Sequence, residues 1–198
     1  MKSDSNPANI KTLLNKLDRQ YKPDDPPASE PVTQLVIGML QWQATRKQAE
    51  QAFSRLMNEL VDINELRVSQ DHELVQLIGS NYPLAEERIA RLREALNEIF
   101  VREHGVAMQS IASKGKKEQR AYLDSLPAVP PYVAAQVMLL SFGGHALPID
   151  ARLIALLAEE SIIDADATPS QAEGSLLRQV KAADALHAHT LLQAWADD

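Results

Sequence analysis

One acidic residue, Asp150, stands where a carboxylate could do chemistry. It follows Pro148 and Ile149 and opens a stretch with apolar residues at helical spacing, so we expect it at the N-terminus of a helix. A carboxylate there can cap the helix by accepting backbone N–H groups. If it faces a cleft, it can instead stabilise positive charge in a transition state or activate a water. The residue pattern leaves both roles open.

Other kinds of chemistry are excluded by residue type or spacing. The chain has no cysteine, which excludes disulfides, thiolate catalysis, cysteine-ligated zinc and iron–sulfur clusters. His187 and His189 are two positions apart, so on a helix they diverge by roughly 200° and cannot chelate one metal ion. We therefore expect no metal site and no cofactor.

The elements that position Asp150 are readable in residues 120–156. A helix over 118–125 leads into a proline-bearing turn over 126–131, and an apolar helix follows over 132–142. Gly143 and Gly144 end that helix, as glycine often does at a helix C-terminus. The pattern predicts a helix-hairpin-helix at 118–141, a short loop, and a third helix that begins with the acid.

The rest of the chain also shows helical spacing, with few glycines and 45 % hydrophobic residues, which predicts an all-α fold. Residues 1–7 are polar and expected to be disordered. Residues 21–31 hold four prolines and predict an irregular linker or arm. The expected helix-capping residues, with alternatives where two fit, are Asn9 or Asn6, Thr45, Asp62, Ser69 or Asp71, and Thr168 or Ser170.

Four further segments complete the expected elements. A buried helix begins at Pro31, and a closing helix spans 185–195. A loop is expected over 105–117. A long helix is expected over 84–104; its predicted inward residues are Ile89, Leu92, Leu96, Ile99 and Phe100, and its predicted partly outward residues are Arg88, Arg91 and Arg93.

The net charge of −7 is unevenly distributed. Residues 148–198 contain three basic and nine acidic residues, whereas residues 1–147 are nearly neutral, so a basic face is possible there. The densest basic run is Lys114 to Lys117, either a solvated loop tip or a phosphate contact. No stretch has the length and apolarity of a signal peptide or membrane span, so we expect a cytoplasmic protein without membrane contact.

Four segments resemble motifs of the endonuclease III-like helix-hairpin-helix DNA glycosylases. Residues 126–135, Leu-Pro-Ala-Val-Pro-Pro-Tyr-Val-Ala-Ala, resemble the family hairpin Leu-Pro-Gly-Val-Gly, two residues, then Thr-Ala. Residues 148–152, Pro-Ile-Asp-Ala-Arg, resemble Pro-Val-Asp-Thr-His, which carries the catalytic aspartate. Residues 40–45 resemble the segment whose glutamine enters the DNA, and Ile78-Gly79 resembles the wedge turn. The order and spacing agree over nearly the whole chain.

The resemblance implies a two-lobed helix-hairpin-helix glycosylase fold and removal of a damaged or mismatched base from double-stranded DNA. It implies that Asp150 is the catalytic carboxylate. The expected DNA contacts are Gln43, Ala128, Val129, Val133, Lys116, Lys117 and Arg120. The expected base pocket is formed by Tyr132, Trp42 and His145. The implied lobes are 31–147 and 148–198, with the helix of residues 1–30 packed on the second, and we expect a monomer.

Several departures from the family pattern limit the activity. Tyr132 stands where bifunctional members have a lysine, and tyrosine cannot form a Schiff base, so lyase activity is not expected. Ala128 and Pro130 replace the hairpin glycines, and Pro130 and Pro131 have no N–H to offer a phosphate. The four-cysteine loop of the iron–sulfur members is absent. The predicted function is a monofunctional glycosylase; the alternative is a non-catalytic descendant that binds DNA structures or proteins.

Overall fold

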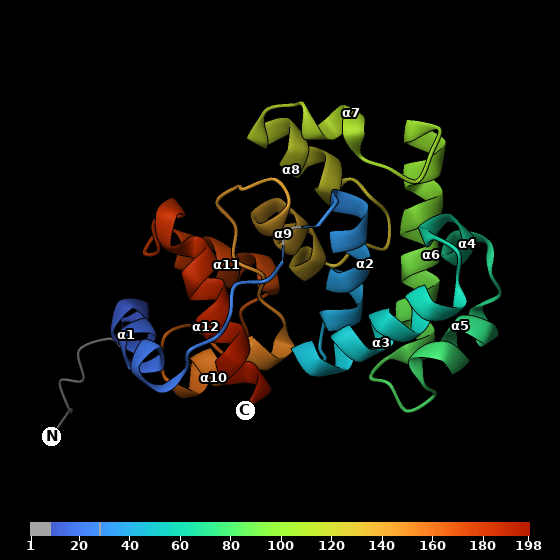
Figure 1. The fold of residues 1–198 in the computed structure, drawn as a ribbon. Helices are drawn as coiled ribbons and strands as arrows, with labels where there is room; N and C mark the ends of the chain where they lie inside the picture. The colour runs from blue at the N-terminus through green and yellow to red at the C-terminus, as the bar shows by residue number, and fades with distance from the viewer. Residues whose placement is uncertain (1–8, 28) are drawn as a thin grey trace, which may run out of the picture.

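The computed structural model describes residues 9–27 and 29–198, a bundle of α-helices with no strand among the described residues (Figure 1). The disorder expected for residues 1–7 lies outside the described residues. The helices are α1 (Ile10–Gln20), α2 (Pro31–Gln41), α3 (Arg46–Glu59), α4 (Ile63–Val68), α5 (Asp71–Ile78), α6 (Ala85–Glu103), α7 (Gln109–Ala112), α8 (Lys116–Asp124), α9 (Pro131–Leu140), α10 (Ala151–Glu159), α11 (Pro169–Leu177) and α12 (Ala185–Asp197), with a 3₁₀ turn, η1 (Ala182–Asp184), before the last.

The buried apolar side chains form two separate cores. The larger core is centred on α2 and α9, with Leu35 and Met39 of α2 and Val137 of α9 inaccessible to solvent. The smaller core combines α1 with α10, α11 and α12, through residues such as Ile10 and Leu191. Figure 1 shows α1 beside α12, although they come from opposite ends of the chain. The fold therefore has two lobes, as predicted, and the N-terminal helix belongs to the lobe that the C-terminal helices build.

Most helix starts follow the predicted capping residues. Asn9, Thr45, Asp62, Asp150 and Thr168 each accept a hydrogen bond from a backbone N–H in the first turn of α1, α3, α4, α10 and α11. Helix α5 differs, because its N-cap is Gln70 and neither of the two neighbouring residues that we predicted. The single turn α7 interrupts the expected loop, and α8 starts two residues earlier than predicted.

The predicted faces of α6 are wrong at two positions. Phe100 is 39 % exposed and lies under the guanidinium of Arg67, at 4.1 Å from the ring centre. Arg88 is fully buried, not partly outward. Arg88 is four residues before Leu92 and shares its face of α6, so it points into the larger core. Helical periodicity accounts for the position of Arg88 in the core, and its hydrogen-bond partners explain how the core tolerates its charge.

Candidate functional site

The helix-hairpin-helix is formed by α8, residues 125–130 and α9, and it keeps a glycine-like backbone without glycine. Ala128 has a φ of 62°, in the left-handed region that costs a non-glycine residue roughly 1–2 kcal/mol. Pro130 is the N-cap of α9 and Pro131 its first residue, where their fixed φ suits a helix start. Arg91 on α6 donates to the Ala128 carbonyl at 3.4 Å. The hairpin geometry therefore survives the loss of both glycines.

The hairpin offers fewer backbone donors than a glycine-bearing turn. The N–H groups of Ala128 and Val129 make no hydrogen bond within the described residues, and both residues are half-buried. Pro130 and Pro131 have no N–H. The N–H of Val133 already donates to the Pro130 carbonyl at 2.9 Å, and its side chain is buried. Of the three predicted backbone contacts, Ala128 and Val129 have a free donor and Val133 does not.

Asp150 is 1 % exposed, and both oxygens of its carboxylate are engaged. Oδ1 accepts from the backbone N–H of Leu153 at 3.1 Å and so caps α10. Oδ2 accepts from the backbone N–H of Gln43 at 2.9 Å and from Nε of Arg152 at 3.1 Å. The sequence left two roles open for Asp150, helix capping and catalysis. The geometry displays the capping role.

Beyond Arg152, a chain of polar contacts continues across the lobe boundary. Arg152 Nη1 pairs with Asp197 Oδ1 at 3.1 Å, and Gln193 Nε2 donates to the same oxygen at 2.8 Å. Asp197 Oδ2 accepts from the backbone N–H of Arg46, the first residue of α3, at 2.8 Å. The end of α12 is thereby tied to α3 in the other lobe, and the ion pair between Arg152 and Asp197 stands beside Asp150.

Tyr132 joins the same network from α9. Its side chain is buried, and its hydroxyl donates to Gln193 Oε1 at 3.1 Å. Burial raises the pKa of Tyr132 well above its usual value, and the charge of Asp150 raises it further. Tyr132 is therefore a neutral hydrogen-bond donor, close to Asp150 but held by α12.

Gln43 and Trp42 lie where α2 ends. Gln43 has a φ of 55°, and its backbone N–H points at Asp150. Trp42 is half-buried, with the guanidinium groups of Arg91 and Arg88 at 5.4 and 5.9 Å from its ring centre. The structure thus brings Trp42, Gln43, Ala128 and Asp150 to the same region, through the contact of Gln43 with Asp150 and the contacts of Arg91 with Trp42 and Ala128.

Arg88 is the buried cation beneath this region. It donates to the carbonyl oxygens of Met39, Trp42 and Pro83, and so caps the C-terminal end of α2. Burial lowers the pKa of Arg88 to about 10, and the nearby charge of Arg152 lowers it further. Arg88 therefore fixes the backbone that presents Trp42 and Gln43.

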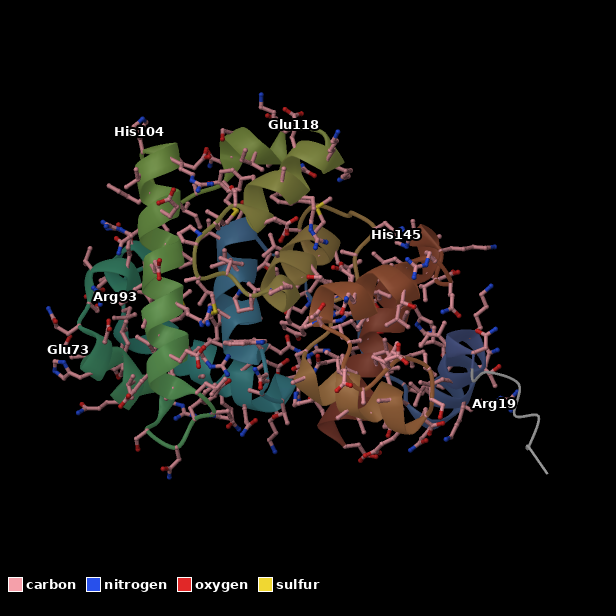
Figure 2. The ribbon with its side chains drawn as sticks, turned by 180° about the vertical axis from the view of Figure 1, so that it is seen from behind. Arg19, Glu73, Arg93, His104, Glu118 and His145 are labelled. Atoms are coloured by element: carbon pink, nitrogen blue, oxygen red, sulfur yellow. The ribbon has the colours of Figure 1, made fainter. Side chains whose placement is uncertain are left out.

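The predicted basic contacts lie at the other end of the hairpin helices. Lys116 begins α8 and donates to the carbonyl of Phe142, just beyond the end of α9. Lys117 is exposed beside it. Glu118, labelled in Figure 2, marks this end of α8 at the edge of the molecule. Since α8 and α9 are joined at the hairpin, Lys116 and Lys117 lie a helix length away from Ala128. The two lysines and Ala128 therefore cannot contact the same phosphate.

Arg120 is occupied by acidic partners. It donates to both oxygens of Glu173 on α11 at 3.0 Å and to Asp124 at 3.0 Å. Glu173 is buried and also accepts from the N–H of Leu147. In this structure Arg120 thus links the two lobes, with its charge compensated.

His145 lies apart from Asp150. Its ring Nε2 is 2.9 Å from the Val180 carbonyl, and the residue is exposed in the loop between α9 and α10. Figure 2 shows it near the surface beside α11. The structure does not bring it together with Trp42 and Tyr132.

A pocket of about 220 Å³ lies between the lobes, under the proline-rich arm. Its floor comes from α2, α9 and α12, and Asp197 and Gln193 stand in its wall. Asp150 and Tyr132 do not line it, because the contacts of Arg152 with Asp197 and of Tyr132 with Gln193 lie between. No group of three or more candidate metal ligands exists among the described residues, nor any helix long and apolar enough to span a membrane.

The sequence motifs did not reveal Arg88, Arg152, Gln193 or Asp197. Arg152 had a signal, because it stands two residues after Asp150 in the quoted motif. Gln193 and Asp197 had none, since Tyr132 and Arg46, the residues of the other lobe that they contact, lie far away in the sequence. Of these residues, Arg152 pairs with the Asp150 carboxylate directly, and Asp197 holds Arg152 in place.

No family model and no curated protein matches the sequence. Solved structures match the fold. Endonuclease III in a covalent DNA intermediate is 16 % identical with a TM-score of 0.73, over 94 % of this chain and 84 % of that one. The helix-hairpin-helix DNA glycosylase fold is the fold of this chain.

Two further structures agree with this fold. A thermostable thymine-DNA glycosylase is 17 % identical with a TM-score of 0.64, over 95 % of this chain and 83 % of that one. The 8-oxoguanine glycosylase/lyase of Clostridium acetobutylicum, bound to double-stranded DNA, is 14 % identical with a TM-score of 0.72, over 93 % of this chain and 66 % of that one. At these identities the likeness concerns the glycosylase fold alone.

Proposed function

We propose that this protein binds duplex DNA at the region formed by Gln43, Trp42 and the hairpin, and recognises DNA structure without cleaving the N-glycosidic bond. The fold supports DNA binding, since the structures it matches include DNA complexes. The free N–H groups of Ala128 and Val129 are donors for a backbone phosphate. The proposal that no bond is cleaved rests on one observation, which is that the Asp150 carboxylate is already occupied by hydrogen bonds within the protein.

Cleavage of an N-glycosidic bond builds positive charge on the sugar, and a carboxylate must approach it. The Asp150 carboxylate accepts three hydrogen bonds, is 1 % exposed and is paired with a guanidinium. Its negative charge is therefore neutralised before any substrate arrives. Tyr132, where a lysine would attack the sugar, has no amine and is itself hydrogen-bonded.

The test is binding to short duplexes that carry an abasic-site analogue, against undamaged duplex, at low and moderate salt. We expect tighter, salt-sensitive binding to the analogue by the native chain. Incubation with a panel of duplexes containing damaged or mismatched bases should release no base. A lack of preference at both salt concentrations would reject the DNA-binding proposal. Release of a base by the native chain, but not by Asp150→Asn, would show that the protein does cleave the N-glycosidic bond.

A second candidate is a monofunctional glycosylase, and one observation favours it. Arg152, which pairs with Asp150, also pairs with Asp197, and Asp197 lines the pocket between the lobes. If DNA binding breaks the ion pair with Asp197, Asp150 can face a base in the pocket. Asp197→Ala should then increase base release, whereas Asp198→Ala, which removes a neighbouring acid bonded to Tyr21, should not. No release from Asp197→Ala would eliminate this candidate.

A further inference from the structure

A groove of about 730 Å³ lies on the smaller lobe, between the end of α10, the loop that follows it and α11. Figure 1 shows these helices on the side of the molecule away from α4 and α5. The lining combines aliphatic side chains, such as Ile162, Ile163 and Ala165, with the charged residues Asp164, Asp166 and Arg178. None of the residues proposed to bind DNA lines this α10–α11 groove.

The loop that forms one wall of the groove is fixed at both ends. At the end of α10, the N–H groups of Ser161 and Ile162 donate to carbonyls of the last turn at 2.9 Å each, with Ser161 in the left-handed region at a φ of 55°. These two bonds form a Schellman motif. Thr168 caps α11 at the other end of the loop, and Ile162 packs against the smaller core. The fold therefore sets the shape of the groove, which lowers the cost of ordering it around a partner.

The groove has uncompensated negative charge. Asp164 and Asp166 are exposed, and no ion pair among the described residues includes either of them. Lys16 on α1 pairs instead with Glu160, just before the loop, at 3.4 Å. Residues 148–198 hold nine acidic and three basic residues, so the field around the groove attracts cations and repels the phosphates of a duplex.

The mixture of aliphatic and acidic lining residues favours a peptide over a metal ion. The two aspartates belong to no group of three or more candidate metal ligands among the described residues. A metal ion would also make no use of the half-buried Ile162 and Ile163. The volume of about 730 Å³ lies within the roughly 300–1,000 Å³ of pockets that bury a drug-sized ligand, so it accommodates side chains of a partner.

We infer that the α10–α11 groove docks a basic segment of a partner protein. An aliphatic side chain of the segment packs on the two isoleucines, and its Lys or Arg side chains lie beside Asp164 and Asp166. Helix α10 has 9 residues, a length of roughly 13 Å, and separates the groove from Asp150 at its start. Partner and duplex therefore bind near different ends of α10, and the inference does not rest on the proposed DNA binding.

The experiment selects a displayed library of short random peptides on the native chain. Counter-selection uses Ala165→Lys, which places a cation in the groove, and the control Ala155→Lys adds the same charge to an exposed position of α10 outside it. We expect the surviving peptides to combine Lys or Arg with Leu, Ile, Val or Met. By fluorescence anisotropy, such a peptide should bind Ala165→Lys more than about tenfold more weakly than the native chain, and Ala155→Lys less than about twofold more weakly.

Variants that remove charge test the acidic side of the groove. Asp164→Asn combined with Asp166→Asn should weaken peptide binding about three- to tenfold at low salt and less at moderate salt, as for the loss of two exposed ion pairs. Asp24→Asn combined with Asp25→Asn removes two exposed acids of the proline-rich arm and should change the affinity by less than about twofold. Arg178→Gln should strengthen binding, because it removes a positive charge from the lining.

Several outcomes would overturn the inference. One is that no peptide distinguishes the native chain from Ala165→Lys, or that the surviving peptides are acidic. Another is an equal loss of affinity in the two double variants, which would show an effect of net charge alone. Self-association of the native chain that Ala165→Lys abolishes would make a second copy the occupant and overturn the assignment to a partner protein. Binding of the abasic duplex can succeed or fail in each case, so the two proposals are tested separately.

Discussion

The carboxylate of Asp150 accepts the backbone N–H of Gln43 at 2.9 Å, across the boundary between the two cores. Asp150 begins α10 in the smaller lobe, and Gln43 follows α2 in the larger one. The contact holds Gln43 in its left-handed conformation, with a φ of 55°. One acidic side chain thus caps a helix, orients the segment expected to enter DNA, and joins the lobes.

This arrangement predicts that Asp150 contributes to stability. Asp150→Asn keeps a capping oxygen but removes the charge that pairs with the half-buried Arg152, and it places an amide where two donors converge. We expect a loss of about 2–3 kcal/mol in the free energy of unfolding, below the 3–5 kcal/mol for a fully buried pair. Urea denaturation of the native and variant chains measures it.

Asp164→Asn is the matched control, because Asp164 is an exposed acid in the loop after α10. It should change the free energy of unfolding by less than about 0.5 kcal/mol. Carboxylates kept for catalysis often lower stability, so their removal is neutral or stabilising. A neutral or stabilising Asp150→Asn would therefore contradict a structural role and support the glycosylase candidate.

A second prediction concerns the hairpin. Ala128 occupies a left-handed conformation with a φ of 62°, which glycine adopts without strain. Ala128→Gly should stabilise the protein by about 1 kcal/mol, or raise Tm by roughly 2–4 °C for a chain of this size. Ala121→Gly, at an exposed site within α8, should instead destabilise it by about 1 kcal/mol. Destabilisation by both would show that the alanine methyl is needed for packing.

Local patterns predicted most of the helices, because helix starts and apolar faces are encoded by neighbouring residues. Thr45, Asp62 and Thr168 lie directly before apolar periodic stretches, and each caps the helix that follows. The described residues of the proline-rich arm, 21–27, 29 and 30, are irregular, as expected because prolines have no N–H group to donate. The order of the motifs predicted the fold, and the solved structures confirm that fold.

The state of the site could not be predicted, because it depends on contacts between distant residues. The Asp150 motif is compatible with an open cleft or a closed one. The pairing of Arg152 with Asp197 decides between them, and 45 positions separate these residues in the chain. Arg88 was misjudged for the same reason, since the carbonyl groups that make its burial possible belong to α2 and to the loop before α6.

A third prediction follows from the burial of Arg88. Arg88→Met keeps much of the side-chain volume but leaves the carbonyls of Met39, Trp42 and Pro83 without their donor. We expect a loss of more than about 2 kcal/mol, since each buried unsatisfied group costs about 1–3 kcal/mol. Arg91→Met removes a guanidinium near the same Trp42 ring from a partly exposed site and should cost less than about 1 kcal/mol. Equal losses would mean that Arg88 acts through the Trp42 ring.

The fourth prediction is a pH dependence of stability from His189. Burial and the charge of Arg46 lower its pKa to about 4 in the folded chain, from near 6.5 when unfolded. Between these values the unfolded state binds the proton and the folded state does not, so stability falls as pH decreases from about 6.5 to about 4. The loss should reach about 3 kcal/mol, at 1.36 kcal/mol per pKa unit. Urea midpoints at pH 7, 5.5 and 4 should decline less in His189→Leu, and parallel curves would exclude His189 as the cause.

The fifth prediction concerns the contact between Arg120 and Glu173. A double-mutant cycle with Arg120→Met and Glu173→Gln should give a coupling energy of about 1–3 kcal/mol, because Glu173 is buried and both hydrogen bonds measure 3.0 Å. The i,i+4 pair of Arg102 with Glu98 is a more exposed control, with an expected coupling of about 0.3–0.5 kcal/mol.

The same Arg120 variant tests its expected contact with DNA. A residue that neutralises one phosphate contributes about one unit to the slope of log affinity against log salt concentration. Since Glu173 and Asp124 already occupy Arg120, we expect Arg120→Met to leave that slope unchanged. Lys117→Gln, at an exposed position one turn before Arg120, should lower the slope if the start of α8 reaches a phosphate. A lower slope for Arg120→Met, with weak coupling to Glu173, would make Arg120 a DNA contact and not a link between the lobes.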